Sequence, residues 1–297
     1  MQTILRKPST TPLAPSELIL NNDGSVYHLA LKNENIADLV ITVGDPDRVK
    51  KVSSRFERIE FTAEHREFVT HTGYFKGERI TVISSGIGPD NMDILVQELD
   101  AAVNIDPKTR LQCEKMRKLK IIRLGTSGAL QADIPVDHYV VPQYSIGLDG
   151  TAHFYDLTFE EDEMLINAKF SELLPAPLNR PYTAKSNQEL NKLLTDINVF
   201  SGITLTAGGF YAPQTRELRL PNAYPLQEKY RNFRYQDLRI CNFEMETSML
   251  FALGGALGHE CAAILNIIAN RERGEFSKNA TQSVENLIDY VLMKIVG

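Results

Sequence analysis

The stretch LVITVGDPDR, residues 39–48, combines the strand, the turn and the helix start that decide the expected fold. Its first five residues are apolar or β-branched, which predicts a buried strand ending at Gly44. Asp45 can cap a helix and Pro46 suits its first turn, so a helix is expected to follow at once. The glycine and the amides of this helix start favour an anion, and Arg48 lies one turn further on. A plain strand-to-helix turn with a solvated arginine is the simpler interpretation of this stretch alone.

Strand-like and helix-like segments alternate along the remainder of the chain. Strands are expected at 79–83, 120–124, 139–142, 202–206 and 261–269, and helices from Asp90 onward, over 242–258 and over 281–296. This alternation indicates an α/β layered fold with a largely parallel or mixed central sheet. Ligands of such sheets bind at the carboxyl ends of the strands, where the glycine-rich turns of this sequence fall.

The composition is that of an ordinary globular chain. Its 297 residues are 43% hydrophobic and 24% charged, with a net charge of −6 that disfavours nucleic acid and anionic membranes as partners. No apolar run approaches the roughly 20 residues of a membrane span. Residues 1–16, rich in proline, are expected to form an extended amino-terminal arm without the features of a signal peptide. Residues 17–297 are expected to form a single domain, with 108–118 as an exposed helix or loop.

No metal or nucleotide motif stands out. Cys113, Cys241 and Cys261 are scattered without metal-ligand spacing, so we expect reduced thiols, no metal site and a cytoplasmic location. The sequence contains no G-x-S-x-G or Walker loop. Gly86-Ile-Gly88 is only half of a dinucleotide motif and is more typical of a packing turn.

Two segments place charge beside apolar sequence. Arg123 lies near the end of an expected strand, where an arginine needs either a bound anion or an internal Asp or Glu partner. Thr126 next to it could hold phosphate or a sugar hydroxyl. Glu244 and Glu246 lie at the start of an expected buried helix and need arginine partners or sugar hydroxyls, unless they only complement the helix dipole. Glu244 and Glu246 are not expected to act as a pair of general acid and base, because positions i and i+2 do not share a helix face.

A third segment, residues 210–216, places a stacking aromatic (Phe210), an amide (Gln214) and a guanidinium (Arg216) in one loop. Together they match the donors and acceptors of a planar heterocycle such as uracil. His28 and the pair His65-Arg66 stand in otherwise uninformative sequence, where histidines are usually structural or exposed.

Taken in order, these segments resemble the nucleoside phosphorylase family, most closely its uridine phosphorylase branch. The resemblance runs from about residue 28 to residue 271. It rests on GDPDR (44–48), HREF (65–68), SGIG (85–88), RLGTSG (123–128), FYAPQTR (210–216), NFEME (242–246) and NR (270–271). It implies a three-layer α/β fold with a central mixed β-sheet flanked by helices.

The resemblance also implies a role for each matching residue. The phosphate site comprises Gly44, Arg48, Arg123 and Thr126, with Arg66 from a neighbouring subunit; the ribose site comprises Met245 and Glu246, with His28 from that subunit; the base site comprises Phe210, Gln214, Arg216 and Arg271. Arg123, Gln214 and Arg216 would carry the catalysis by holding phosphate and stabilising the departing base. A homo-oligomer, either a dimer or a hexamer, is therefore implied. Inorganic phosphate is a co-substrate, no cofactor is needed, and some relatives bind a monovalent cation near the positions of Glu67 and Ser84.

The expected reaction is phosphorolysis of uridine to uracil and ribose 1-phosphate in nucleotide salvage. Purine-specific relatives place an aspartate where this chain has Ala269-Asn270-Arg271, so a pyrimidine is favoured. The alternatives are a nucleosidase that uses water, and a phosphorylase for another nucleoside, purine or deoxypyrimidine. The third alternative is a catalytically silent nucleoside-binding protein. In this chain the acidic segment 89–93 stands where relatives carry small and hydroxyl residues, and it could repel phosphate.

Overall fold

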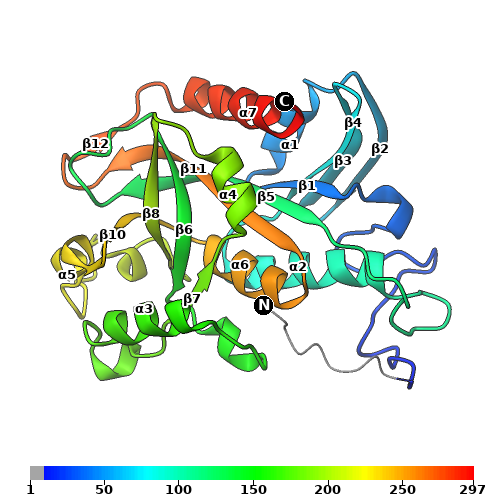
Figure 1. Ribbon diagram of the computed structural model, residues 1–297, viewed down its shortest axis with the longest axis horizontal. Helices are drawn as coiled ribbons and strands as arrows, with labels where there is room; N and C mark the ends of the chain where they lie inside the picture. Colours follow the sequence, from blue (N-terminus) through cyan, green and yellow to red (C-terminus); the bar gives the residue numbers. More distant parts are fainter. Residues whose placement is uncertain (1–9) are drawn as a thin grey trace.

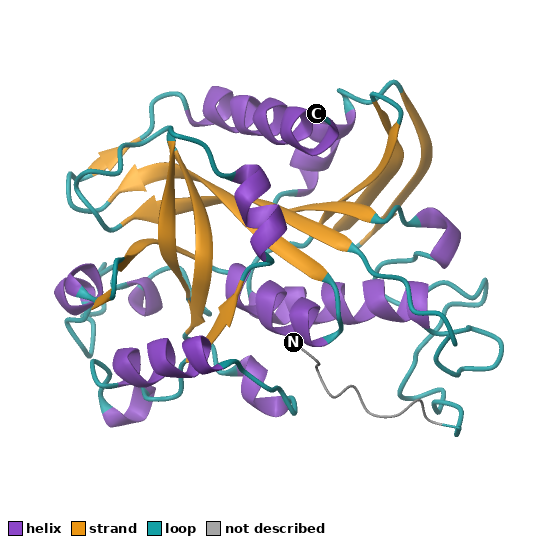
Figure 2. Cartoon of the chain, in the orientation of Figure 1, coloured by secondary structure: helices purple, strands orange, loops and turns teal. Residues whose placement is uncertain are grey.

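The computed structural model describes residues 10–297, in which the strands form one twelve-stranded mixed sheet (Figures 1 and 2). The strands are β1 (Leu39–Val43), β2 (Arg58–His65), β3 (Phe68–Phe75), β4 (Glu78–Ser84), β5 (Lys120–Ala129), β6 (Tyr139–Gly147), β7 (Tyr182–Lys185), β8 (Val199–Thr206), β9 (Arg234–Tyr235), β10 (Leu238–Glu244), β11 (Glu260–Asn270) and β12 (Glu275–Phe276). The α-helices are α1 (Pro46–Ser53), α2 (Pro89–Asn104), α3 (Glu161–Ser171), α4 (Gln188–Leu194), α5 (Gln227–Asn232), α6 (Thr247–Ala256) and α7 (Ala280–Val296). Short 3-10 helices occur at η1 (Asn33–Asn35), η2 (Thr151–Phe154), η3 (Ala176–Leu178) and η4 (Ala212–Gln214).

Several neighbouring strands run parallel, so their carboxyl ends lie at the same end of the sheet. β1 lies between β4 and β5, and β11 pairs with β5, all in parallel. β6, β8 and β10 are also mutually parallel, and β10 and β6 join β5 and β11 by antiparallel pairing, so five strands close a ring. The antiparallel strands β2 and β3 extend the sheet beyond β4. The predicted α/β class with a mixed sheet is confirmed.

Helices cover both faces of this sheet, which makes three layers (Figure 1). α1 and α7 pack on one face over Ile41, Ile122 and Ile264. α2 and α6 pack on the other face over Val40 and neighbouring core residues. Both clusters consist of buried hydrophobic residues, so burial of these faces is the main stabilising contribution. Within residues 10–297, no helix combines the length and the apolar character needed to cross a bilayer.

Several expected boundaries were wrong. The strand from 120 continues through the TSG residues to Ala129, because β11 pairs with it along its full length. Residues 242–258 are not one helix: β10 ends at Glu244, and α6 begins at Thr247. Helix α2 begins at Pro89, directly after Gly88 with φ of 100°, and not at Asp90. In each case the strand pairing or turn geometry outweighs the local apolar pattern.

Other expectations were confirmed or remain predictions. Helix α1, with Asp45 as its cap, and the terminal helix α7 occur where expected, and residues 108–118 are turns and irregular chain. The hairpin strands β2 and β3 and the helices α3 to α5 were not predicted. The arm of residues 1–16 lies partly outside the described residues. Its division from a domain at 17–297 stays a prediction.

Candidate active site

A pocket of about 760 Å³ lies where the carboxyl ends of β1, β4, β5, β10 and β11 converge. Ten of the residues assigned to substrate by the resemblance line it. They are Gly44, Arg48, Arg123, Thr126, Phe210, Gln214, Arg216, Met245, Glu246 and Arg271. This is the edge at which parallel α/β sheets bind ligands, because each strand ends there in a loop. Tertiary structure therefore brings together segments that are up to 227 residues apart (271 − 44).

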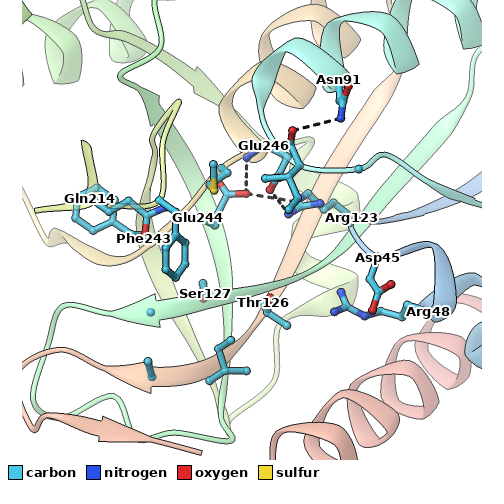
Figure 3. Close-up of a pocket in the computed structure, with 18 of the residues that line it drawn as sticks. Asp45, Arg48, Asn91, Arg123, Thr126, Ser127, Gln214, Phe243, Glu244 and Glu246 are labelled. Atoms are coloured by element: carbon cyan, nitrogen blue, oxygen red, sulfur yellow. Dashed lines mark hydrogen bonds and ion pairs between the residues drawn. The ribbon is translucent and has the colours of Figure 1, made fainter. Parts of the chain in front are cut away.

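Arg123 forms the centre of a buried ionic network (Figure 3). Its Nε lies 3.3 Å from Oε2 of Glu244, and its Nη2 donates to Oε2 of Glu246. Its side chain is 4% exposed, and among the described residues its Nη1 has no hydrogen-bond partner. The interpretation with internal carboxylate partners is therefore confirmed. Binding of an anion by this arginine stays a prediction, for which the unpaired Nη1 is an available donor.

Glu244 belongs to the same network, although the family resemblance implies no role for it in the site. At the end of β10 its carboxylate accepts the N–H groups of Glu246 and Thr247, both at 2.9 Å, and the hydroxyl of Thr206 at 2.5 Å. These bonds hold the carboxylate against Arg123. The expectation that Glu244 and Glu246 point apart was wrong, because the first ends a strand and the second precedes a helix. The alternating geometry of a strand end could have revealed their convergence.

Glu246 is held at the boundary between the ionic network and the pocket. Its Oε1 accepts the backbone N–H of Gly88 at 2.8 Å, and its Oε2 pairs with Arg123. Burial raises the pKa of Glu246, an effect that the nearby Arg123 opposes. The carboxylate can therefore accept hydrogen bonds from sugar hydroxyls while remaining paired.

Arg48 supplies a second cation at the same end of the pocket. It lies in the first turn of α1, and its Nη1 donates to the carbonyl of Leu124 at 3.2 Å. Burial and the proximity of Arg123 lower the pKa of Arg48. The simpler interpretation, a fully solvated arginine, was therefore wrong. Two guanidinium groups that repel each other form a place where an anion is favoured.

The loop of residues 210–216 forms the opposite end of the pocket. Figure 3 shows Gln214 on the far side of the Arg123–Glu246 pair from Arg48. The Arg216 guanidinium stacks 3.8 Å from the centre of the Phe210 ring and donates to Oε1 of Gln214 at 2.5 Å. Burial, together with the nearby Arg271, lowers the pKa of Arg216 to about 10. Aromatic, amide and guanidinium groups thus adjoin, as a planar polar ligand requires.

His28 and Arg66 do not line this pocket. Nδ1 of His28 lies 2.6 Å from Oε1 of Glu98, and the Arg66 guanidinium lies 5.9 Å from the centre of the Tyr27 ring. His65 links the two segments by a 2.9 Å contact to the carbonyl of His28. The two predicted residues therefore lie together, apart from the pocket of their own chain. Their contribution to a neighbouring subunit stays a prediction.

The acidic segment 89–93 does not bring its carboxylates into the pocket. Asp93 accepts the hydroxyl of Tyr155, and neither it nor Asp90 lines the pocket. Asn91 does line it, with Nδ2 donating to the carbonyl of Ile87 at 3.3 Å. The carboxylates of this segment therefore do not line the pocket in which phosphate is expected.

The end of the late strand β11 and the residue after it place no acid at the base end. Ala269 and Arg271 line the pocket, whereas Asn270 is buried and donates to the carbonyls of Gln131 and Ile134 at 3.0 and 2.8 Å. Among residues 10–297, no cluster of three His, Cys, Asp or Glu side chains could hold a metal ion. A monovalent cation near Glu67 and Ser84 stays a prediction.

Comparisons with known proteins agree with this architecture. Residues 38–295 match the family model described as the phosphorylase superfamily. The chain is 30% identical to a uridine phosphorylase of Thermococcus kodakarensis over 86% of this chain and 81% of that protein. It is 29% identical to a uridine phosphorylase of Haemophilus influenzae, with 90% and 96% covered.

A solved structure of Trypanosoma brucei nucleoside phosphorylase, described as showing uridine phosphorylase activity, superposes with a TM-score of 0.86 at 27% identity. The match covers 94% of this chain and 99% of that one. Since the family model spans most of the sequence and the fold is shared, the chain belongs to the phosphorylase superfamily.

Proposed function

We propose that the protein catalyses phosphorolysis of uridine to uracil and ribose 1-phosphate. One observation carries the proposal: the buried Arg123, whose Nη1 has no hydrogen-bond partner among the described residues, lines a pocket whose other end holds Gln214 and Arg216. A site with an anion end, a carboxylate and a heterocycle end suits a nucleoside and phosphate bound side by side. The names of the relatives, uridine phosphorylases for the most part, support the same reaction.

At the anion end, we propose that Arg48 and Arg123 hold phosphate, with the backbone at Gly44 and the hydroxyl of Thr126 close by. Both guanidinium groups make charge-assisted hydrogen bonds, which fix the nucleophile beside the sugar. Met245 and Glu246 would contact the ribose between the two ends. Phosphate then attacks C1′ as the bond to the base breaks.

At the base end, we propose that Gln214 and Arg216 stabilise the departing pyrimidine. Negative charge develops on the carbonyl oxygens of the base, and preorganised donors lower the energy of that state. Phe210 provides the aromatic surface, and Arg271 supports the loop. Because no carboxylate from segment 269–271 lines the pocket, protonation of a purine ring nitrogen has no donor in this segment.

We propose a homo-oligomer, a dimer or a hexamer, in which His28 and Arg66 of one subunit complete the site of the next. Neither lines its own pocket, which supports an intersubunit role. Inorganic phosphate is the co-substrate, and the reaction as proposed uses no organic cofactor or metal. The three free cysteines suit the reducing cytoplasm, where we place the enzyme in nucleoside salvage.

The test is release of uracil from uridine, measured with and without millimolar phosphate and with inosine as the control nucleoside. We expect release from uridine only when phosphate is present. Release without phosphate would identify a nucleosidase, and release of base from inosine alone would reverse the base assignment. Tight binding of uridine without release under either condition would indicate a silent nucleoside-binding protein.

A further inference from the structure

The base-recognition loop, residues 210–216, is tied to α5 through Arg271. From the end of β11, Arg271 donates to the carbonyl of Gln214 at 2.7 Å and to the carbonyl of Thr215 at 3.2 Å. Its Nη2 also donates to Oε1 of Gln227, the first residue of α5, at 3.1 Å. One guanidinium therefore joins the loop to the helix.

Gln227 is held from its other side as well. Its Nε2 donates to Oε1 of Glu272 at 3.4 Å, and the second oxygen of that carboxylate pairs with Arg231 on the same helix. Burial lowers the pKa of Arg271, and the nearby Glu272 opposes this effect. The amide of Gln227 thus accepts from a cation and donates to an anion, which sets its orientation.

The loop needs such a restraint because of its backbone at Thr215. This β-branched residue has φ of 60°, in the left-handed region that favours glycine. Strained backbone persists only where surrounding contacts hold it. Arg271 binds the carbonyl of Thr215, and the Thr215 hydroxyl lies 3.5 Å from Oε1 of Gln227. Thr215 directly follows Gln214, and Arg271 donates to the carbonyls of both residues, so these contacts hold the backbone that carries the Gln214 side chain.

We infer that Gln227 is a positioning residue for base recognition, acting through Arg271 on the loop that carries Gln214. The inference rests on the proposed function, in which this loop binds the pyrimidine. Loss of Gln227 should weaken nucleoside binding and leave phosphate binding unchanged, because Arg48 and Arg123 hold the other end of the pocket.

The variant Gln227→Ala tests this inference. We expect the KM for uridine to rise about tenfold, as for loss of a hydrogen bond to a charged group, and the KM for phosphate to stay within about twofold. Amide hydrogen exchange in residues 210–216 should become faster, which reports on the loop independently of activity. The control Gln282→Ala removes a 3.0 Å hydrogen bond to Asn286 on α7 and should change neither quantity.

A double variant, Gln227→Glu with Glu272→Gln, exchanges the amide and the carboxylate and should restore the KM for uridine. An acceptor again faces Arg271, and Arg231 again finds an acceptor. Unchanged exchange in 210–216 in Gln227→Ala would overturn the inference, as would an equal rise in the phosphate KM. If the wild-type protein releases no uracil, the proposed function fails, while the exchange rates still decide whether Gln227 holds the loop.

Discussion

Replacing Arg123 with alanine should destabilise the protein as well as abolish phosphorolysis. The substitution leaves Glu244 and Glu246 inside the protein without their cationic partner, although their side chains are only 1% and 5% exposed. Breaking a buried ion pair by removing one partner costs about 3–5 kcal/mol, because the remaining charge stays desolvated. We therefore expect the free energy of unfolding to fall by about 3 kcal/mol or more near neutral pH.

The destabilisation should depend on pH, since burial already raises the pKa of Glu246 above its usual 4.5. Without Arg123 that pKa rises further. A carboxyl group with a raised pKa in the folded state favours folding below its unfolded pKa and loses this contribution as the pH rises through its folded pKa. The stability difference between wild type and Arg123→Ala should therefore be smaller at about pH 5 than at about pH 7.5.

Urea unfolding followed by circular dichroism at the two pH values measures this difference, and uracil release measures activity. A triple variant, Arg123→Met with Glu244→Gln and Glu246→Gln, removes all three charges and should recover most of the stability without activity. If the free energy of unfolding of Arg123→Ala near neutral pH fell by less than about 1 kcal/mol, the reasoning would be refuted, since buried unpaired carboxylates destabilise a protein by more than this. The reasoning would also be refuted if the stability difference between wild type and Arg123→Ala were as large at about pH 5 as at about pH 7.5.

Three further substitutions test the ends of the pocket and the residue assigned to a neighbouring subunit. Arg48→Ala should raise the KM for phosphate about tenfold and leave the KM for uridine nearly unchanged. The control Arg55→Ala removes a surface ion pair with Glu285 and should change neither KM. Equal changes in the two variants would contradict the assignment of Arg48 to the phosphate site. Gln214→Ala should lower kcat/KM for uridine about 10²-fold and affect any turnover of inosine less; equal losses on both nucleosides would argue against base recognition. We propose that His28 binds the 5′-hydroxyl of the ribose, so His28→Ala should lower kcat/KM for uridine about tenfold but not for 5′-deoxyuridine, which lacks this hydroxyl. A loss on both substrates would remove His28 from the ribose site.

Much of the fold could be predicted from local pattern. The apolar runs at β1, β4 and β11 and the amphipathic helix α7 occur close to where periodicity placed them. The hairpin of β2 and β3 could not be found in this way, because its burial pattern is irregular and only pairing with β4 completes it. For the same reason, the local apolar pattern from 242 predicts one helix, although strand pairing with β8 extends through Glu244.

The candidate site was predicted as a set of residues but not as an arrangement. Local sequence shows that Arg123 and Glu246 need partners, because buried charges do. It does not show that they pair with each other across 123 positions, nor that Glu244 belongs to the same network. Gln227, beyond the recognisable motifs, has no local feature that marks it.

By itself, the sequence determined the class of fold, the family and the chemical kinds of group available, since periodicity, turn residues and buried charges are properties of short segments. Only the tertiary structure decided which groups meet. It joined Arg123 to two glutamates, left one of its donors unpaired among the described residues, and placed Gln214 at the opposite end of the pocket from Arg48. The reason is physical: contacts between distant segments depend on strand order and pairing, which burial of the whole sheet selects.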